Sequence, residues 1–188
     1  VELANSMIEF AALSKTTMSV PQQVTEIVAT YFGDYSNSSI HTFSSGVGLE
    51  VIDLHKKNSS TRYYMQQFNV DSGLITELFF CINKASIEIC YGDLISQPAF
   101  IEEKQLQKFK FAYMIPPFGM KATVQQEGMI ENDPYGRFNY FGKPSKSHLD
   151  LGYLVSGLNA LSEDGKGAFL LPIGALFRSG MDQEIRER

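Results

Sequence analysis

Apolar residues recur at two spacings along this chain, and segments of the two kinds alternate. In segment 21–32, Val24, Ile27 and Val28 follow the three- and four-residue spacing of a helix that buries one face. Other segments are short, rich in β-branched and aromatic residues, and typical of strands. The pattern predicts helices over 2–13, 21–32, 49–57, 71–83, 100–107 and 151–161, and strands over 39–43, 61–68, 86–93, 108–115 and 165–172.

The alternation of strands and helices predicts an α/β fold. Its expected form is a doubly wound, mainly parallel sheet with helices on both faces. A chain of 188 residues with 44% hydrophobic and 20% charged residues suits one globular domain. Gly, Pro, Asn and Ser are scattered through 120–147, which is therefore expected to be a loop, and 181–188 is expected to begin another helix.

Several short polar or glycine-bearing segments directly follow the predicted strands. In parallel sheets, ligands bind beyond the carboxyl ends of the strands, so these segments are expected to lie along one edge and form one site. They are SSGVG (44–48), QFN (67–69), GD (92–93) and IPPFG (115–119).

The charge balance limits the partners that this chain can bind alone. A net charge of −5 argues against a strong autonomous DNA binder, because phosphates are neutralised by Lys and Arg. It leaves open a subunit that meets DNA through a basic partner. The sequence has no apolar run of membrane-spanning length and no metal-ligand spacing, so we expect no membrane association, no metal and a cytoplasmic location.

Four segments together carry a resemblance to a known family. They are VPQQVTEIV (20–28), NDPYGRF (132–138), KSHLDLGYL (146–154) and GKGAFLLPIGALFRSGMDQEIRER (165–188). In order and spacing they resemble the modification subunit of type I restriction–modification systems, an adenine-N6 DNA methyltransferase. The resemblance implies the Rossmann-like fold of S-adenosylmethionine-dependent methyltransferases. It also implies that 1–188 is a single methyltransferase core, without the family's N-terminal helical domain and C-terminal extension.

The resemblance further implies a cofactor and partners. The cofactor would be S-adenosylmethionine, the substrate would be DNA met through a specificity subunit, and a restriction subunit would complete the system. Such enzymes flip an adenine out of the duplex. A polar residue before Pro-Pro then accepts a hydrogen bond from the adenine amino group, and the following aromatic ring stacks on the base.

The catalytic segment of this chain keeps most of that pattern and loses one group. Pro116, Pro117 and Phe118 are retained, so the loop and its stacking ring are expected to persist. Ile115 stands at the polar position and has no side-chain hydrogen-bonding atom. Loss of one preorganised polar group in comparable sites costs on the order of 10² to 10³ in rate.

The cofactor positions implied by the resemblance are also mixed. Asp93 keeps the acidic residue that contacts the cofactor's adenine ring, whereas Gln67 replaces the acidic residue that anchors its ribose. His41, Val47 and Ser19 depart from an acidic, a glycine and an aromatic position. The candidate cofactor-binding residues are Pro21, Gly46, Gly48, Gln67 and Asp93.

Three hypotheses remain open at this point. The chain is an active methyltransferase module, a member of the family with reduced or lost catalysis that serves as a scaffold, or an unrelated α/β protein. If the cofactor positions are impaired as well, Ile115→Asn alone should not restore methylation. The similar NDPYG segment (132–136) follows no predicted strand, so we expect it to shape a loop, with Arg137 available for a phosphate or a carboxylate.

Overall fold

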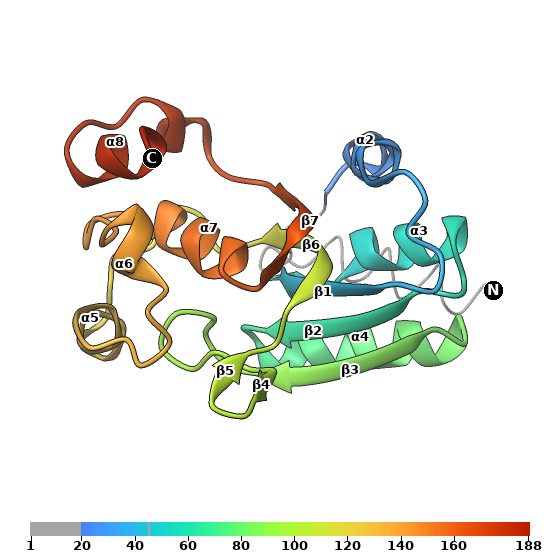
Figure 1. The fold of residues 1–188 in the computed structure, drawn as a ribbon. Coiled ribbons are helices and arrows are strands. Elements are labelled where there is room, and N and C mark those ends of the chain that lie inside the picture. The colour runs from blue at the N-terminus through green and yellow to red at the C-terminus, as the bar shows by residue number, and fades with distance from the viewer. Residues whose placement is uncertain (1–19, 45) are drawn as a thin grey trace.

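A five-stranded parallel sheet forms the centre of the molecule. The computed structural model describes residues 20–44 and 46–188, and the predicted helix over 2–13 lies outside them. The strand order is β3-β2-β1-β6-β7, with every neighbouring pair parallel (Figure 1). The doubly wound parallel sheet is therefore confirmed. The strands are β1 (Ser39–Ser44), β2 (Arg62–Gln67), β3 (Ser86–Tyr91), β6 (Phe109–Ile115) and β7 (Leu161–Phe169).

Each face of the sheet has its own apolar core. Alternate residues of β6 point to opposite faces, so Tyr113 and Ile115 belong to one core while Ala112 and Met114 belong to the other. The first core packs against α2 (Gln22–Phe32), α3 (Leu49–Lys57) and α4 (Val70–Ile82). The second packs against α5 (Val124–Glu131), α6 (Phe138–Phe141), α7 (Asp150–Leu158) and α8 (Met181–Arg186).

The strand register brings the predicted loops to one edge. Ser44 at the end of β1 pairs with Gln67 on one side and with Ile115 on the other, and Gln67 pairs with Tyr91. The carboxyl ends of β3, β2, β1 and β6 therefore form one row. The segments that follow these ends are those expected to share an edge.

The prediction of a polar helix over 100–107 is wrong. The segment forms a hairpin of β4 (Ile101–Glu102) and β5 (Gln105–Leu106), with Glu103 and Lys104 at positive φ in the turn. Phe100 anchors the hairpin, because its ring meets His41 edge-on at 5.5 Å and Phe109 at 6.1 Å. Aromatic packing therefore outweighs the helix propensity of the Glu, Lys and Gln residues.

The prediction of a loop over 120–147 is wrong in part. Helix α5 occupies 124–131 and begins with a capping box, in which Thr123 and Gln126 exchange side-chain and backbone hydrogen bonds. This Thr-x-x-Gln pattern is a sequence signal of a helix start. Strand β7 begins four residues before its predicted start at 165, and a 3₁₀ helix, Ile173–Leu176, follows the strand.

Candidate functional site

The glycine-bearing turn between β1 and α3 is locked by its surroundings. Gly48 has a φ of +70°, and a Cβ there would lie 3.0 Å from both Met65 Cε and Thr76 Cγ2. Only glycine fits without displacing those side chains. Gly46 N donates to Ser44 Oγ at 3.1 Å, which tightens the start of the turn.

Two residues that depart from the family pattern have side chains buried inside the protein. His41 is in the middle of β1, buried, and stacked on Phe109 at 4.8 Å, rather than at the start of the turn. Burial lowers the pKa of His41 to about 3, so the ring is neutral. Val47 is also buried, in the core beneath α3 and α4. The branched side chain of Val47 is therefore accommodated in the core.

Gln67, at the end of β2, reaches the same turn. Its side chain is fully buried, and Nε2 donates to the Gly46 carbonyl at 2.8 Å. Its Oε1 has no hydrogen-bond partner among the residues that the structure describes. A buried amide oxygen without a partner is costly, and it is an acceptor that a hydroxyl group can satisfy.

Asp93 follows β3 and uses most of its carboxylate to shape its own loop. Oδ1 accepts hydrogen bonds from Ile95 N at 3.1 Å, Ser96 N at 2.7 Å and Ser96 Oγ at 2.9 Å. Oδ2 accepts one from the Tyr153 hydroxyl at 2.7 Å. Among the described residues Oδ2 accepts this one hydrogen bond, so one of its two lone pairs is left for another donor.

The segment 115–119 leaves the end of β6 and crosses the edge. The Ile115 side chain is only 3% exposed and lies in the core shared with α2, α3 and α4. Pro116 is buried and Pro117 is half-buried, whereas Phe118 is 40% exposed. The aromatic ring is therefore available at the surface, while Ile115 contributes to the apolar core.

A buried chain of charges holds this segment in place. Gly119 N donates to Asp150 Oδ1 at 2.8 Å. Asp150 Oδ2 accepts from Arg178 at 2.5 Å, and Arg178 Nε donates to Asp182 at 2.6 Å. The bonds from Gly119 to Asp150 and from Arg178 to Asp150 join residues 31 and 28 positions apart, so sequence spacing does not reveal them.

Arg137 is not available to a phosphate, contrary to the sequence prediction. It is buried and pairs with Asp133 at 3.0 Å. Its guanidinium also donates to the carbonyls of Leu94 at 2.8 Å and Ile95 at 2.7 Å. Arg137 thus binds a carboxylate of its own segment, 132–138. Its bonds to Leu94 and Ile95 hold the loop that follows Asp93, so the segment shapes a loop, as expected.

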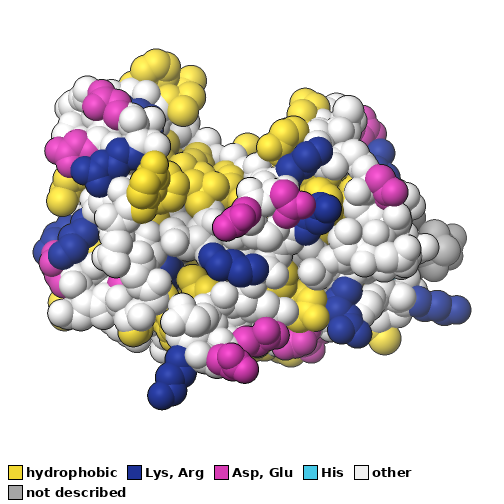
Figure 2. Space-filling view, viewed as in Figure 1, with side chains coloured by type: hydrophobic (Ala, Val, Ile, Leu, Met, Phe, Trp, Pro, Cys, Tyr) yellow, Lys and Arg dark blue, Asp and Glu magenta, His cyan; other side chains and the backbone are white. Residues whose placement is uncertain are grey.

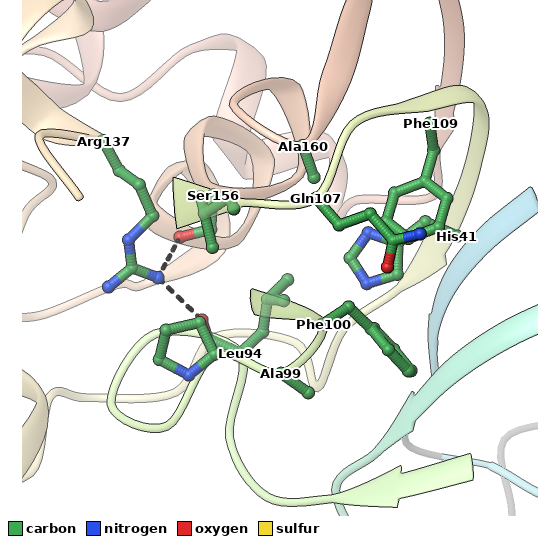
Figure 3. Close-up of a pocket in the computed structure, with 11 residues that line it drawn as sticks. His41, Leu94, Ala99, Phe100, Gln107, Phe109, Arg137, Ser156 and Ala160 are labelled. Carbon is green, nitrogen blue, oxygen red and sulfur yellow. Dashed lines mark hydrogen bonds between the residues drawn. The ribbon is translucent and has the colours of Figure 1, made fainter. Parts of the chain in front are cut away.

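The cavity beside Arg137 and His41 is too small to be the site (Figure 3). Its volume of about 10 Å³ has room for roughly one water molecule. It is also lined by Phe109, at the start of β6, and by Ala160, just before β7, at the opposite end of these strands from the carboxyl edge. Among residues 20–44 and 46–188, no group of three His, Cys, Asp or Glu side chains could hold a metal ion.

Pro21 caps the start of α2 and is exposed, and its carbonyl accepts from Val24 N at 2.9 Å. Helix α2 packs on α3, the helix that begins after the glycine turn.

Within the described part of the chain, no helix is both long and apolar enough to cross a membrane.

Glu50 is a buried carboxyl group that the sequence analysis did not consider. It lies in the first turn of α3, and Ser44 Oγ donates to its Oε1 at 3.1 Å. Burial raises its pKa from 4.5 to about 7. The folded state therefore holds this proton more tightly than the unfolded chain does.

We expect the Glu50→Gln variant to gain stability relative to the wild type as the pH rises. Stability from this carboxyl is fully present below pH 4.5 and is lost as the pH rises through about 7. The stability difference between variant and wild type should thus grow by roughly 2–3 kcal/mol from about pH 5 to about pH 8. Urea unfolding at both pH values measures this. Glu26→Gln, on the exposed face of α2, is the matched control, and an equal difference at both pH values would contradict the assignment.

Two side chains at this edge have free acceptor positions that suit the cofactor that the resemblance implies. One of them, Gln67, lacks the negative charge of the family pattern. Gln67 offers an unpartnered buried oxygen, and Asp93 offers one remaining acceptor position. Both can accept hydrogen bonds from the hydroxyl or amino groups of an adenine nucleoside. Gln67 does so without the negative charge of a carboxylate, and charge-assisted hydrogen bonds are about twice as strong.

The strand order and the helices on both faces of the sheet define a doubly wound, Rossmann-like fold. The family model for N-6 DNA methylase matches residues 7–188, so the chain belongs to the N-6 DNA methylase family.

Several solved structures share this fold. A Vibrio vulnificus YJ016 protein assigned as a modification subunit of a type I restriction enzyme superposes with a TM-score of 0.75 at 13% identity, over 99% of this chain and 41% of that one. TrmN from Thermus thermophilus matches with a TM-score of 0.59 at 15% identity, over 88% and 42%. A S-adenosylmethionine-dependent methyltransferase from Geobacter sulfurreducens, in complex with S-adenosyl-L-homocysteine, matches with 0.52 at 11%, over 84% and 51%. This chain thus spans less than two thirds of each.

Proposed function

We propose that this chain is the methyltransferase core of an adenine-N6 DNA methyltransferase of the type I modification kind, with reduced methyl transfer. S-adenosylmethionine, when bound, supplies the methyl group. Gln67 and Asp93 would hold its ribose and adenine, with Gly46, Gly48 and Pro21 around them. Phe118 would stack on a flipped adenine beside Pro116 and Pro117.

One observation supports the proposal that methyl transfer is reduced. Ile115 buries an apolar side chain at the position where the amino group of the target adenine requires an acceptor. Transfer to an amino nitrogen depends on positioning and on polar groups aimed at the reacting atom. The retained prolines and Phe118 would preserve base stacking without that acceptor.

The surface charge is mixed and does not by itself favour DNA (Figure 2). On the face drawn in Figure 2, Lys and Arg side chains are interspersed with acidic ones, and the surface is hollowed between the regions over α2 and α8. With a net charge of −5, contact with DNA would depend on a specificity subunit, and restriction and specificity subunits are the proposed partners.

A second candidate function is a non-catalytic scaffold in the same assembly. It is favoured by Ile173, Leu176 and Phe177, which are exposed next to one another after β7. Large exposed apolar patches mark surfaces for protein partners. Titration with S-adenosylmethionine separates the two candidates. A methyltransferase core should show weak, saturable binding, whereas a pure scaffold should show none.

A further inference from the structure

The hydroxyl group of Tyr153 joins two loops of the edge. Tyr153 lies on α7 and is buried, and it donates to Asp93 Oδ2 at 2.7 Å. The Tyr153 hydroxyl oxygen also accepts a hydrogen bond from Gln126 Nε2 at 3.2 Å. The loop after β3 and the first turn of α5 are thus connected through one side-chain atom.

Gln126 carries this connection to the loop that bears Phe118. Its Oε1 accepts from Thr123 N at 2.9 Å, and Thr123 Oγ1 accepts from Gln126 N at 3.3 Å. Thr123 is the residue at which the loop after Pro117 ends and α5 begins. The amide of Gln126 therefore closes the helix cap with one atom and reaches Tyr153 with the other.

Helix α7 also holds the beginning of the same loop. Asp150 Oδ1 accepts from Gly119 N at 2.8 Å, and Leu149 N donates to the Met120 carbonyl at 2.9 Å. Asp150 and Tyr153 are three residues apart on α7 and face the same side of the helix. Both ends of the loop 118–123 are consequently attached to α7, which in turn contacts Asp93.

The direction of the hydrogen bonds at Tyr153 is determined by its surroundings. Its ring stacks on Phe43, with centroids 5.3 Å apart and planes 20° from parallel, so the hydroxyl has a fixed position. Burial, together with the Asp93 carboxylate, raises the pKa of Tyr153, and the hydroxyl keeps its proton. The hydroxyl therefore donates a hydrogen bond to Asp93, because a carboxylate cannot donate, and accepts one from Gln126.

We propose that Tyr153 is a positioning residue that couples the Asp93 loop to the loop 118–123, so that a ligand bound at Asp93 orders the segment that carries Phe118. The proposal rests on the proposed function for the identity of that ligand, an adenine nucleoside. The coupling itself is a property of the ligand-free protein. Buried hydrogen-bonded networks of this kind make the groups at their two ends interdependent.

Hydrogen exchange in Tyr153→Phe tests the coupling without any ligand. The variant removes one hydroxyl and keeps the ring, and its matched control is Tyr63→Phe, because Tyr63 is a buried tyrosine in the core on the other face of the sheet. We expect amides of both 93–97 and 118–123 to exchange roughly three- to tenfold faster in Tyr153→Phe. Tyr63→Phe should leave both unchanged. Unchanged exchange in 118–123 of Tyr153→Phe, or equal changes in both variants, would overturn the proposal.

Addition of S-adenosyl-L-homocysteine tests the consequence for ligand binding. In the wild type, the ligand should slow exchange in 93–97 and in 118–123, whereas in Tyr153→Phe it should slow exchange in 93–97 alone. Protection of both segments in the variant would overturn the coupling. If the ligand protects neither segment of the wild type, the proposed function fails, and the ligand-free comparison still decides whether Tyr153 couples the loops.

Discussion

Replacement of Arg137 by methionine lowers the free energy of unfolding by about 3–5 kcal/mol, the largest stability effect that we expect in this domain. The guanidinium group is fully buried and pairs with Asp133, whose side chain is almost as buried. Removing the cation leaves a buried carboxylate without its partner. The carbonyls of Leu94 and Ile95 lose donors at the same time.

Urea unfolding of a double mutant cycle measures this effect. The paired variant Asp133→Asn/Arg137→Met removes both charges, so its destabilisation should be smaller than the sum of the two single variants. The difference isolates the interaction between the pair. Additive single effects, or a loss below about 1 kcal/mol in Arg137→Met, would show that the pair is not a structural centre of the domain.

Conversion of Ile115 to asparagine restores no methyl transfer and lowers the free energy of unfolding by roughly 2–4 kcal/mol. The change gives the segment the polar residue that its pattern lacks. However, the Ile115 side chain lies in the core beneath α2 and α3. An asparagine there leaves a cavity and buries an amide, and the loss of charge at Gln67 remains.

The measurement combines urea unfolding with transfer of labelled methyl groups from S-adenosylmethionine to adenine-containing DNA. Ile115→Val is the matched control, because it removes one methyl group and adds no polar atom, at a cost of about 0.5–1.5 kcal/mol. Recovery of robust methylation by Ile115→Asn alone would contradict the claim that the cofactor edge is weakened as well.

Much of the fold could be predicted because its elements are defined by local patterns. Helix α3 occupies the predicted residues 49–57, and α2 and α4 differ from their predicted bounds by a single residue at each end or less. Helices α2 and α3 bury one apolar face against the sheet, so their apolar spacing is clear, whereas α4 also exposes apolar side chains such as Leu74 and Leu78. The parallel direction of the strands was expected from the alternation of strands and helices.

The elements that were missed depend on tertiary contacts. The hairpin at 101–106 exists because Phe100 packs among Tyr64, His41 and Phe109, and no local pattern records those neighbours. Helix α5 is short, and its apolar residues do not form a regular stripe. Its capping box was the one local signal available.

The position of the candidate residues at one edge of the sheet could be predicted, but their hydrogen-bond partners could not. Parallel strands explain why Gln67, Asp93 and Ile115 follow neighbouring strand ends. The hydrogen bond from Tyr153 to Asp93 joins residues separated by sixty positions in sequence. Such pairings result from packing, and sequence spacing does not reveal them. The assignment of site roles to these residues therefore stays a prediction.

Titration of the protein with S-adenosylmethionine by calorimetry tests the central claim most directly, because it asks whether this edge still holds a cofactor. The account predicts one saturable site with a dissociation constant on the order of 10⁻⁴ to 10⁻³ M, about −5.5 to −4 kcal/mol, since Gln67 supplies a neutral acceptor and Asp93 a single remaining position. S-adenosyl-L-homocysteine should compete for the same site. Binding near 10⁻⁶ M, about −8 kcal/mol, would contradict a weakened site, and no saturable binding at all would contradict a retained one.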